Sequence, residues 1–417
     1  MRVLWITNLP MAEAQEYLFH KNQVKEGWLV QLSQLLSKHR EIELHVASRT
    51  AGLSEEKNFT IGSVTHHCYP AGYTKDEKTI ECYWKKLIAS ISPDIAHLQG
   101  TESIQAYSFV MACPEIKTVA SIQGLTSVIL RYFFGGIPEK ELCKFTTMAQ
   151  AVLHDRMVDK YHRMEKSGEL EKEILKRVNY VIGRTEWDKC HTVAINPQLH
   201  YFSCGEIMRP SFYDGRWTPE KCSTHSIFVT QGLVPYKGFH MVLNAMPYIL
   251  RKYPDTKIKV ALLPKVRGKL TVKERLLGGE YMYYTRALIE KLGLDNCIDI
   301  LGSLSEKEMV QEMLNCHVFV SPSAIENSPN SVCEAQLLGV PTIVSNVGGT
   351  ESVNYYPSKN NMYRYEEYEM LADKIVNVFN GKISQSDIEH AIITSREKHN
   401  PSKISERMIE IYNIILQ

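Results

Sequence analysis

The stretch HVFVSPSAIENSPNSVCEAQLLGVPTIVSNV, residues 317–347, contains the signals of a strand, a loop, a helix and a second strand in one run. Apolar and β-branched residues dominate both ends, which is typical of buried strands. Between them, Val332, Ala335 and Leu338 share one helical face, and Ser328 is expected to cap the helix start. Gly339 ends the helix, since glycine readily closes a last turn. The run therefore predicts one strand–helix–strand unit of a parallel sheet.

The same alternation of short apolar strands and helical patterns recurs in both halves of the chain. Nearly continuous apolar strands between helices predict parallel sheets that are covered on both faces. Two such series predict an α/β protein with two doubly wound, Rossmann-like domains. The strands are expected at 2–7, 42–48, 64–70, 94–100, 118–124, 180–185, 226–232, 257–263, 297–303, 317–323 and 341–347.

The length of 417 residues also favours two domains, because one hydrophobic core rarely serves so long a chain. Proline and glycine interrupt the periodicity near 203–220, so we expect domains at 1–205 and 206–399. The final segment, 400–417, reads as a helix that crosses back to join the first domain.

Composition narrows the function classes. Hydrophobic residues make up 44% of the chain and the net charge is +1, which disfavours nucleic-acid binding through a strong global field. No apolar run approaches the roughly 20 residues of a membrane span, and the start lacks a signal-peptide pattern, so we expect a cytoplasmic protein. The cysteines form no CxxC pair, which disfavours zinc binding. No Gly-x-Gly-x-x-Gly or P-loop stretch follows a strand, which disfavours nicotinamide and P-loop folds.

Two carboxylates, Glu326 and Glu334, lie eight positions apart at the predicted strand-to-helix turn. Open parallel sheets bind ligands at the carboxyl ends of their strands, and two such domains would place a site in the cleft between them. A helix start offers N–H groups that suit a diphosphate. One carboxylate could accept hydrogen bonds from ribose hydroxyls, and the other could face a sugar. The alternative is a pair of surface glutamates.

This stretch, extended to AIENSPNSVCEAQLLGVPTIVSNVGG (324–349), resembles the Glu-x7-Glu motif of retaining GT-B glycosyltransferases of family 4. VTQGLVPYKGFHMVLNAM (229–246) resembles the phosphate-binding strand and loop of that family. VIGRTEWDK (181–189) and FSCGEIMRPSFYDGRW (202–217) are similar to its polysaccharide-assembly branch.

The resemblance implies a role for each matching residue. Glu334 would bind the ribose of a nucleotide, and Glu326 would contact the donor sugar near its reacting carbon. Lys237 would stabilise the departing diphosphate in place of a metal ion. Further groups that would contact the donor sugar and phosphates are Asn327, Ser328, Asn330 and Ser331.

The chain departs from the family pattern at two positions. Gly232 stands where an arginine is usual, so Arg184, Arg209 or backbone N–H groups would have to meet a phosphate charge. Gln123 stands where a histidine is frequent, and its amide can hold a sugar hydroxyl but cannot titrate.

The acceptor side is less defined by the sequence. Gly27 and Trp28 keep part of a glycine-containing loop, and His97 at a strand end is either an acceptor contact or a structural histidine. LRYFFGGIPEKELCKF (130–145) leaves three alternatives open: an acceptor loop, a membrane-surface contact or ordinary helix packing.

The resemblance as a whole implies a retaining, metal-independent hexosyltransferase without a cofactor. It would move a sugar from a nucleotide diphosphate sugar, expected to be a UDP-sugar, to a glycan or lipid-linked glycan of a cell-surface polysaccharide. The first domain would bind the acceptor and the second the donor, with the inner membrane face left open as a location. Two alternatives remain: a nucleotide-sugar epimerase of the same architecture, and a non-catalytic sugar-nucleotide-binding partner of an assembly complex.

Overall fold

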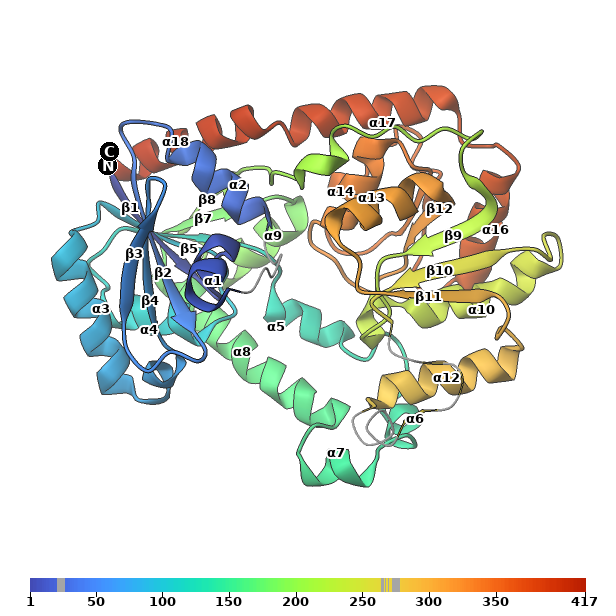
Figure 1. Ribbon diagram of the computed structural model, residues 1–417, viewed down its shortest axis with the longest axis horizontal. Coiled ribbons are helices and arrows are strands. Elements are labelled where there is room, and N and C mark those ends of the chain that lie inside the picture. Colours follow the sequence, from blue (N-terminus) through green and yellow to red (C-terminus); the bar gives the residue numbers. More distant parts are fainter. Residues whose placement is uncertain (21–26, 264–265, 267, 269, 272–277) are drawn as a thin grey trace. The chain divides into compact units, whose positions relative to one another are not determined.

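The structure is a computed structural model that describes residues 1–20, 27–263, 266, 268, 270–271 and 278–417 (Figure 1). The chain forms two compact units. Unit 1 consists of Met1–Val128, Glu165–Met208 and His399–Gln417, and unit 2 consists of Ile129–Met164 and Arg209–Lys398. Each unit contains one sheet, so the predicted α/β fold with two doubly wound sheets is confirmed.

The sheet of unit 1 has eight strands in the order β3-β4-β2-β1-β5-β6-β7-β8. All neighbours run parallel except β3 and β4, which are antiparallel. All six strands that the sequence predicted here are present, and β3 and β8 are additional. The strands are β1 Arg2–Thr7, β2 Glu43–Thr50, β3 Lys57–Ile61, β4 Val64–Pro70, β5 Ile95–Leu98, β6 Thr118–Ser121, β7 Tyr180–Gly183 and β8 His200–Ser203.

The last helix, α18 (Pro401–Leu416), packs in unit 1. Its apolar stripe shares a hydrophobic cluster with Val3 and Trp5 of β1, and the Trp5 indole donates to the Tyr412 hydroxyl at 3.0 Å. The other helices with residues in unit 1 are α1 Ala12–Phe19, α2 Gly27–Leu36, α3 Glu77–Ile91, α4 Ile104–Ala112, α5 Thr126–Ile129, α8 Met157–Arg177 and α9 Glu186–Ile195.

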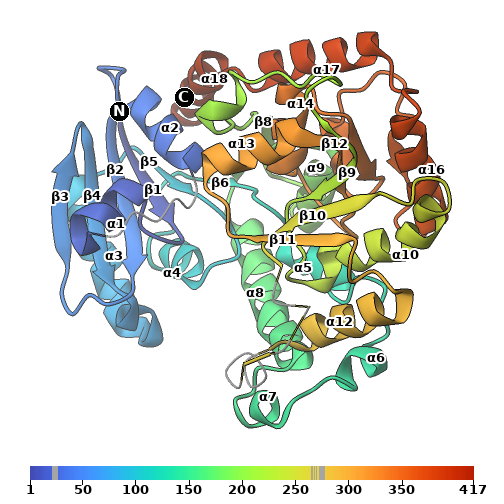
Figure 2. The same cartoon turned by 45° about the vertical axis from the view of Figure 1, so that its right-hand side comes forward.

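The sheet of unit 2 has six parallel strands in the order β11-β10-β9-β12-β13-β14. Figure 2 shows the same elements turned toward this unit. The five strands predicted in this half are present, and β14 is additional. The strands are β9 Ser223–Val229, β10 Lys257–Ala261, β11 Ile298–Gly302, β12 Cys316–Ser321, β13 Thr342–Ser345 and β14 Met362–Tyr363.

The helices of unit 2 begin and end at ordinary capping signals. For example, Ser305 and Glu308 form a capping box at the start of α13, and Gly339 closes α14 with a φ of 75°. The helices are α6 Glu139–Cys143, α7 Met148–Val152, α10 Phe239–Leu250, α12 Glu280–Leu292, α13 Glu306–Asn315, α14 Asn330–Leu338, α15 Thr350–Val353, α16 Tyr368–Phe379 and α17 Gln385–Lys398.

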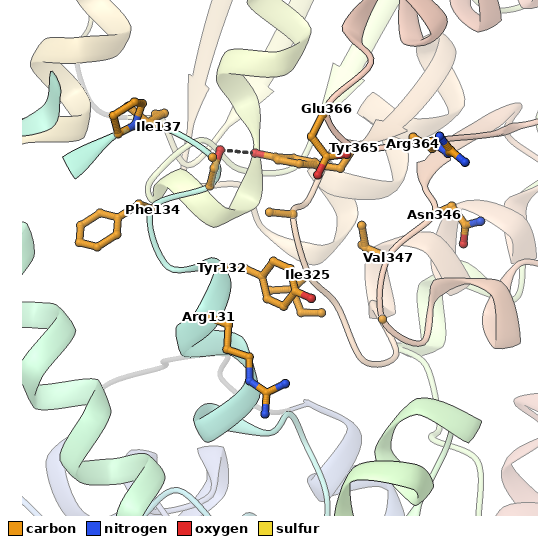
Figure 3. A pocket seen from close by; sticks show the side chains of 15 residues that line it. Arg131, Tyr132, Phe134, Ile137, Ile325, Asn346, Val347, Arg364, Tyr365 and Glu366 are labelled. Atoms are coloured by element: carbon orange, nitrogen blue, oxygen red, sulfur yellow. Dashed lines mark hydrogen bonds between the residues drawn. The ribbon is translucent and has the colours of Figure 1, made fainter. Parts of the chain in front are cut away.

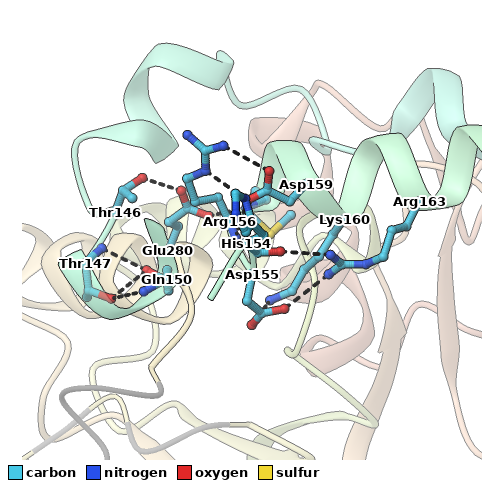
Figure 4. Close-up of polar contacts among 11 residues, drawn as sticks. Thr146, Thr147, Gln150, His154, Asp155, Arg156, Asp159, Lys160, Arg163 and Glu280 are labelled. Atoms are coloured by element: carbon cyan, nitrogen blue, oxygen red, sulfur yellow. Dashed lines mark hydrogen bonds and ion pairs between the residues drawn. The ribbon is translucent and has the colours of Figure 1, made fainter. Parts of the chain in front are cut away.

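The segment Ile129–Met164, which we call the excursion, packs with unit 2 although it lies between β6 and β7 of unit 1. Glu280, at the start of α12, anchors it: the buried carboxylate accepts hydrogen bonds from the Thr146 hydroxyl and the Met157 N–H (Figure 4). Asp155 also pairs with Lys160 at 3.0 Å. The predicted domains, 1–205 and 206–399, differ from the two units in this segment.

Candidate functional site

The loop after β12 and the turn after β9 bring Glu326 and Lys237 together in unit 2. The Lys237 ammonium lies 2.6 Å from Glu326 Oε1, and the Ser323 hydroxyl donates to the same oxygen at 2.7 Å. The Lys237 side chain is 21% exposed and that of Glu326 14%. This ion pair is therefore held in place and remains accessible to a ligand.

Glycines allow the neighbouring loops to approach closely. Gly238 has a φ of 70°, and a Cβ there would lie 1.7 Å from the Pro322 carbonyl oxygen. A Cβ on Gly348 would lie 2.0 Å from the Glu326 carbonyl oxygen, which also accepts from the Gly349 N–H at 2.9 Å. The loops after β9, β12 and β13 therefore support one another, as expected where adjacent parallel strands end.

Lys237 keeps its positive charge. Burial lowers the pKa of this ammonium, but the charge of Glu326 and its hydrogen bond raise it, and the net direction is upward. The ammonium can therefore serve as a fixed cation near neutral pH.

Glu334 lies in α14 and pairs with Arg209 in a two-armed contact. Nε of Arg209 lies 2.7 Å from Oε1, and Nη2 lies 2.7 Å from Oε2. The Glu334 side chain is 4% exposed and that of Arg209 is 26% exposed. Burial raises the pKa of the Glu334 carboxyl, and the Arg209 charge opposes that shift.

The start of α14 differs from the expected cap. Pro329 is the N-cap residue and no side chain caps the helix, so the expectation that Ser328 would do so is wrong. The first N–H groups of a helix have no partner within it, and here they remain available to a ligand. Beside them, Oδ1 of Asn330 is buried and has no hydrogen-bond partner among the described residues. Asn327 is buried, and Ser331 is half-buried.

Gly232 has no room for the arginine usual in the family. A Cβ at this position would lie 2.5 Å from Cδ1 of Leu263 and 3.1 Å from the Phe239 ring. These two side chains fill the space where a longer side chain would begin.

Both arginines that were expected to replace it are engaged with buried carboxylates. Arg209 holds Glu334, as above. In unit 1, Arg184 Nη1 lies 2.7 Å from Glu206 Oε2, and its Nη2 donates to Gln123 Oε1 at 3.0 Å. A phosphate could recruit either arginine only by competing with its carboxylate.

His97 supports the structural alternative, and the expectation of an acceptor contact is wrong for this conformation. The side chain is fully buried, with Nδ1 2.7 Å from the Tyr412 hydroxyl and Nε2 2.7 Å from the Ser121 hydroxyl. Burial lowers the pKa of His97 to about 3, so the imidazole is neutral.

The other acceptor prediction is largely untested by the structure. Gly27 and Trp28 begin α2, while their side-chain surroundings and residues 21–26 lie outside the described residues.

Sequence reasoning missed Ser323 and the Gly348–Gly349 pair, which fix the side chain and the backbone of Glu326. A serine three residues before a glutamate and a glycine pair after the next strand were the signals that could have found them.

Comparison with known proteins assigns the second half of the chain. Residues 223–394 match the family of glycosyl transferases group 1, and they lie within unit 2. A D-inositol 3-phosphate glycosyltransferase of Corynebacterium urealyticum is 27% identical over 116 residues, which cover 28% of this chain and 26% of the relative. The matches span only 26% and 33% of the lengths of the curated relatives.

Solved structures resemble the whole chain. Sucrose-phosphate synthase from Thermosynechococcus elongatus has a TM-score of 0.71 at 12% identity, covering 100% of this chain and 99% of that one. HepE of Anabaena, in complex with UDP-glucose, has a TM-score of 0.65 at 13% identity, covering 99% and 100%. The fold is thus that of GT-B glycosyltransferases, with two Rossmann-like domains, and residues 223–394 form a domain of the group 1 glycosyl transferase type.

Proposed function

We propose that the chain is a retaining glycosyltransferase that uses a nucleotide diphosphate sugar, with a UDP-sugar as the expected donor. The acceptor is a glycan or lipid-linked glycan of a cell-surface polysaccharide. The observation that carries this proposal is the presence of two ion pairs, Lys237–Glu326 and Arg209–Glu334, in the loop and helix that follow β12. The match of residues 223–394 and the likeness to a UDP-glucose complex support it.

In this proposal, each ion pair holds one end of the donor. Glu334 accepts hydrogen bonds from the ribose hydroxyls, because each of its oxygens keeps a lone pair beside the Arg209 bond. The diphosphate lies near the free N–H groups of α14 and the Lys237 ammonium. Asn327, with Ser328 and Ser331, completes the contacts with the sugar and phosphates.

Donor binding would also change the Lys237–Glu326 pair. Phosphate oxygens compete with Glu326 for the ammonium, since both are anionic acceptors. The released carboxylate can then face the sugar, where positive charge develops as the bond to phosphate lengthens.

The reaction breaks the bond between the anomeric carbon and the phosphate oxygen and forms a bond from that carbon to the acceptor oxygen. The acceptor proton passes to the leaving phosphate on the same face of the sugar, which retains the configuration. Gln123 would orient a hydroxyl without titrating. The reaction would take place in the cytoplasm, at the inner membrane face when the acceptor is lipid-linked.

A thermal-shift titration with UDP, GDP, ADP and a panel of their sugars tests the donor. We expect UDP and one UDP-sugar to raise the melting temperature, and Lys237→Ala to weaken both shifts. The preferred donor is then incubated with and without glycan acceptors. Conversion of the donor sugar without acceptor would favour an epimerase, and binding without transfer to any acceptor would favour a non-catalytic partner.

A further inference from the structure

Unit 2 contains a cavity of about 820 Å³ that the donor roles above leave unused. Figure 3 shows the 131–138 part of the excursion on one side and the loops of 346–348 and 364–366 on the other. Its volume lies within the range of small-molecule sites, roughly 300–1,000 Å³.

The wall formed by the excursion is fixed by buried contacts. The Gly135 carbonyl accepts hydrogen bonds from the Tyr365 hydroxyl at 2.8 Å and from His240 Nε2 at 3.0 Å. Burial lowers the pKa of His240 to about 4, so this imidazole is neutral and can keep a proton on Nε2 for the carbonyl. Gly135 has a φ of 58°, and a Cβ there would lie 2.3 Å from the Pro235 carbonyl oxygen. The cavity is thus bounded by a wall that is pre-formed.

The lining combines an apolar floor with polar groups at the rim. Ile325 and Tyr365 are buried, whereas Arg131 and Arg364 are exposed, and Tyr132 keeps 43% of its surface open. The cavity therefore offers two guanidinium groups, an aromatic ring and the Asn346 amide. Such groups suit a ligand with a polar, ring-shaped body and a negative charge.

The charge at the rim is positive. Arg131 has no ion pair among the described residues, and Arg364 lies 3.9 Å from Glu367 while its side chain is 80% exposed. Glu366 is the one acidic side chain among the described residues that line the cavity.

The cavity also adjoins the loop of the proposed sugar site. Ile325 lines it, and the next residue, Glu326, pairs with Lys237. Gly348 lines it as well and packs against the Glu326 carbonyl. We propose that this cavity binds an acidic sugar of the acceptor glycan, with Arg131 and Arg364 contacting its carboxylate or phosphate. Its assignment to the acceptor rests on the proposed function; the binding of an acidic sugar does not.

Ligand-observed NMR titrations test this inference directly. The probes are a disaccharide of glucuronic acid and glucose, the all-glucose disaccharide of the same linkage, glucose 6-phosphate and glucose. We expect an acidic probe to bind at least about tenfold more tightly than its neutral counterpart, and more weakly as NaCl is raised, because the arginines are exposed. The double variant Arg131→Gln/Arg364→Gln should lose this preference, and Arg251→Gln, outside the cavity, should keep it.

The outcomes separate the two proposals. Equal binding of acidic and neutral probes, or an acidic preference that survives in the double variant, would overturn the inference. An arginine-dependent preference for glucose 6-phosphate alone would support it with phosphate as the charged group. UDP is titrated into the same samples, and loss of UDP binding with an intact acidic preference would reject the donor proposal and leave the cavity assignment standing.

Discussion

Arg209 and Glu334 lie 125 positions apart in the chain and meet in a two-armed ion pair with both nitrogen–oxygen distances at 2.7 Å. This geometry matches the planar guanidinium to the carboxylate and orients both oxygens of Glu334. A site that must accept from two vicinal hydroxyls benefits from a carboxylate whose direction is already set. The pair thus explains how a residue inside a helix can serve as a specific acceptor.

Glu334→Ala should weaken UDP binding by about tenfold to a hundredfold. The reason is that a hydrogen bond to a charged group contributes roughly 1.5–3 kcal/mol. Isothermal calorimetry with UDP measures the loss, and Arg209→Gln is the companion variant. If Glu334 acts on the ribose directly, Arg209→Gln should lose less affinity than Glu334→Ala, and unchanged affinity in the latter would reject the ribose role.

Glu326→Gln should leave UDP binding intact or slightly stronger while lowering turnover about 10²- to 10³-fold. The amide keeps the size of the side chain but neither stabilises positive charge on the sugar nor competes for Lys237 as strongly. Donor saturation kinetics beside UDP affinity check this, with Glu334→Gln as the comparison, which high donor concentration should partly rescue. Normal turnover of Glu326→Gln at saturating donor would contradict the assignment.

Transfer should persist in excess EDTA. Lys237 supplies a positive charge for the diphosphate, and no group of three or more metal-ligating side chains is found in the described part of the chain. The measurement is the transfer rate before and after chelation, and a loss that Mg²⁺ or Mn²⁺ restores would refute metal independence.

Acid should destabilise unit 1 through His97. Its folded-state pKa of about 3 lies below the ordinary value of 6.5, so the unfolded chain binds the proton first as pH falls. Stability is therefore complete above pH 6.5 and declines below it by up to about 1.4 kcal/mol per pH unit until the folded-state pKa is reached. Urea unfolding at several pH values should show a shallower decline in His97→Gln, and equal slopes in both proteins would argue against it.

Gly135→Ala should destabilise unit 2 more than Gly293→Ala does. Both glycines have positive φ, 58° and 65°, so both substitutions carry similar backbone strain. Only Gly135 also has a backbone oxygen, that of Pro235, within 2.3 Å of the new Cβ, whereas nothing lies within 4 Å at Gly293. Thermal unfolding should place the melting temperature of Gly135→Ala several degrees lower, because a displaced wall loses buried hydrogen bonds. Equal melting temperatures would mean that the excursion adapts without cost.

The strands were predictable where both faces are buried, as in β1 and β12, because apolar β-branched runs of that length have few other readings. The strands β3 and β8 were missed since they lie at the sheet edges and alternate with exposed polar residues. The nature of the site residues followed from motif and spacing. The partners of Arg184, Arg209 and His97 could not be read, because each is set by a residue distant in the sequence.

The excursion has a consequence for how this chain can be cut and synthesised. A fragment limited to residues 209–398 would lack Gly135, leaving His240 and the Tyr365 hydroxyl without the carbonyl that they share in the buried interior. During translation, residues 129–164 leave the ribosome well before the strands of unit 2 exist. Their docking must therefore wait for almost the whole chain, and β7 can join its sheet while this segment is still unpartnered.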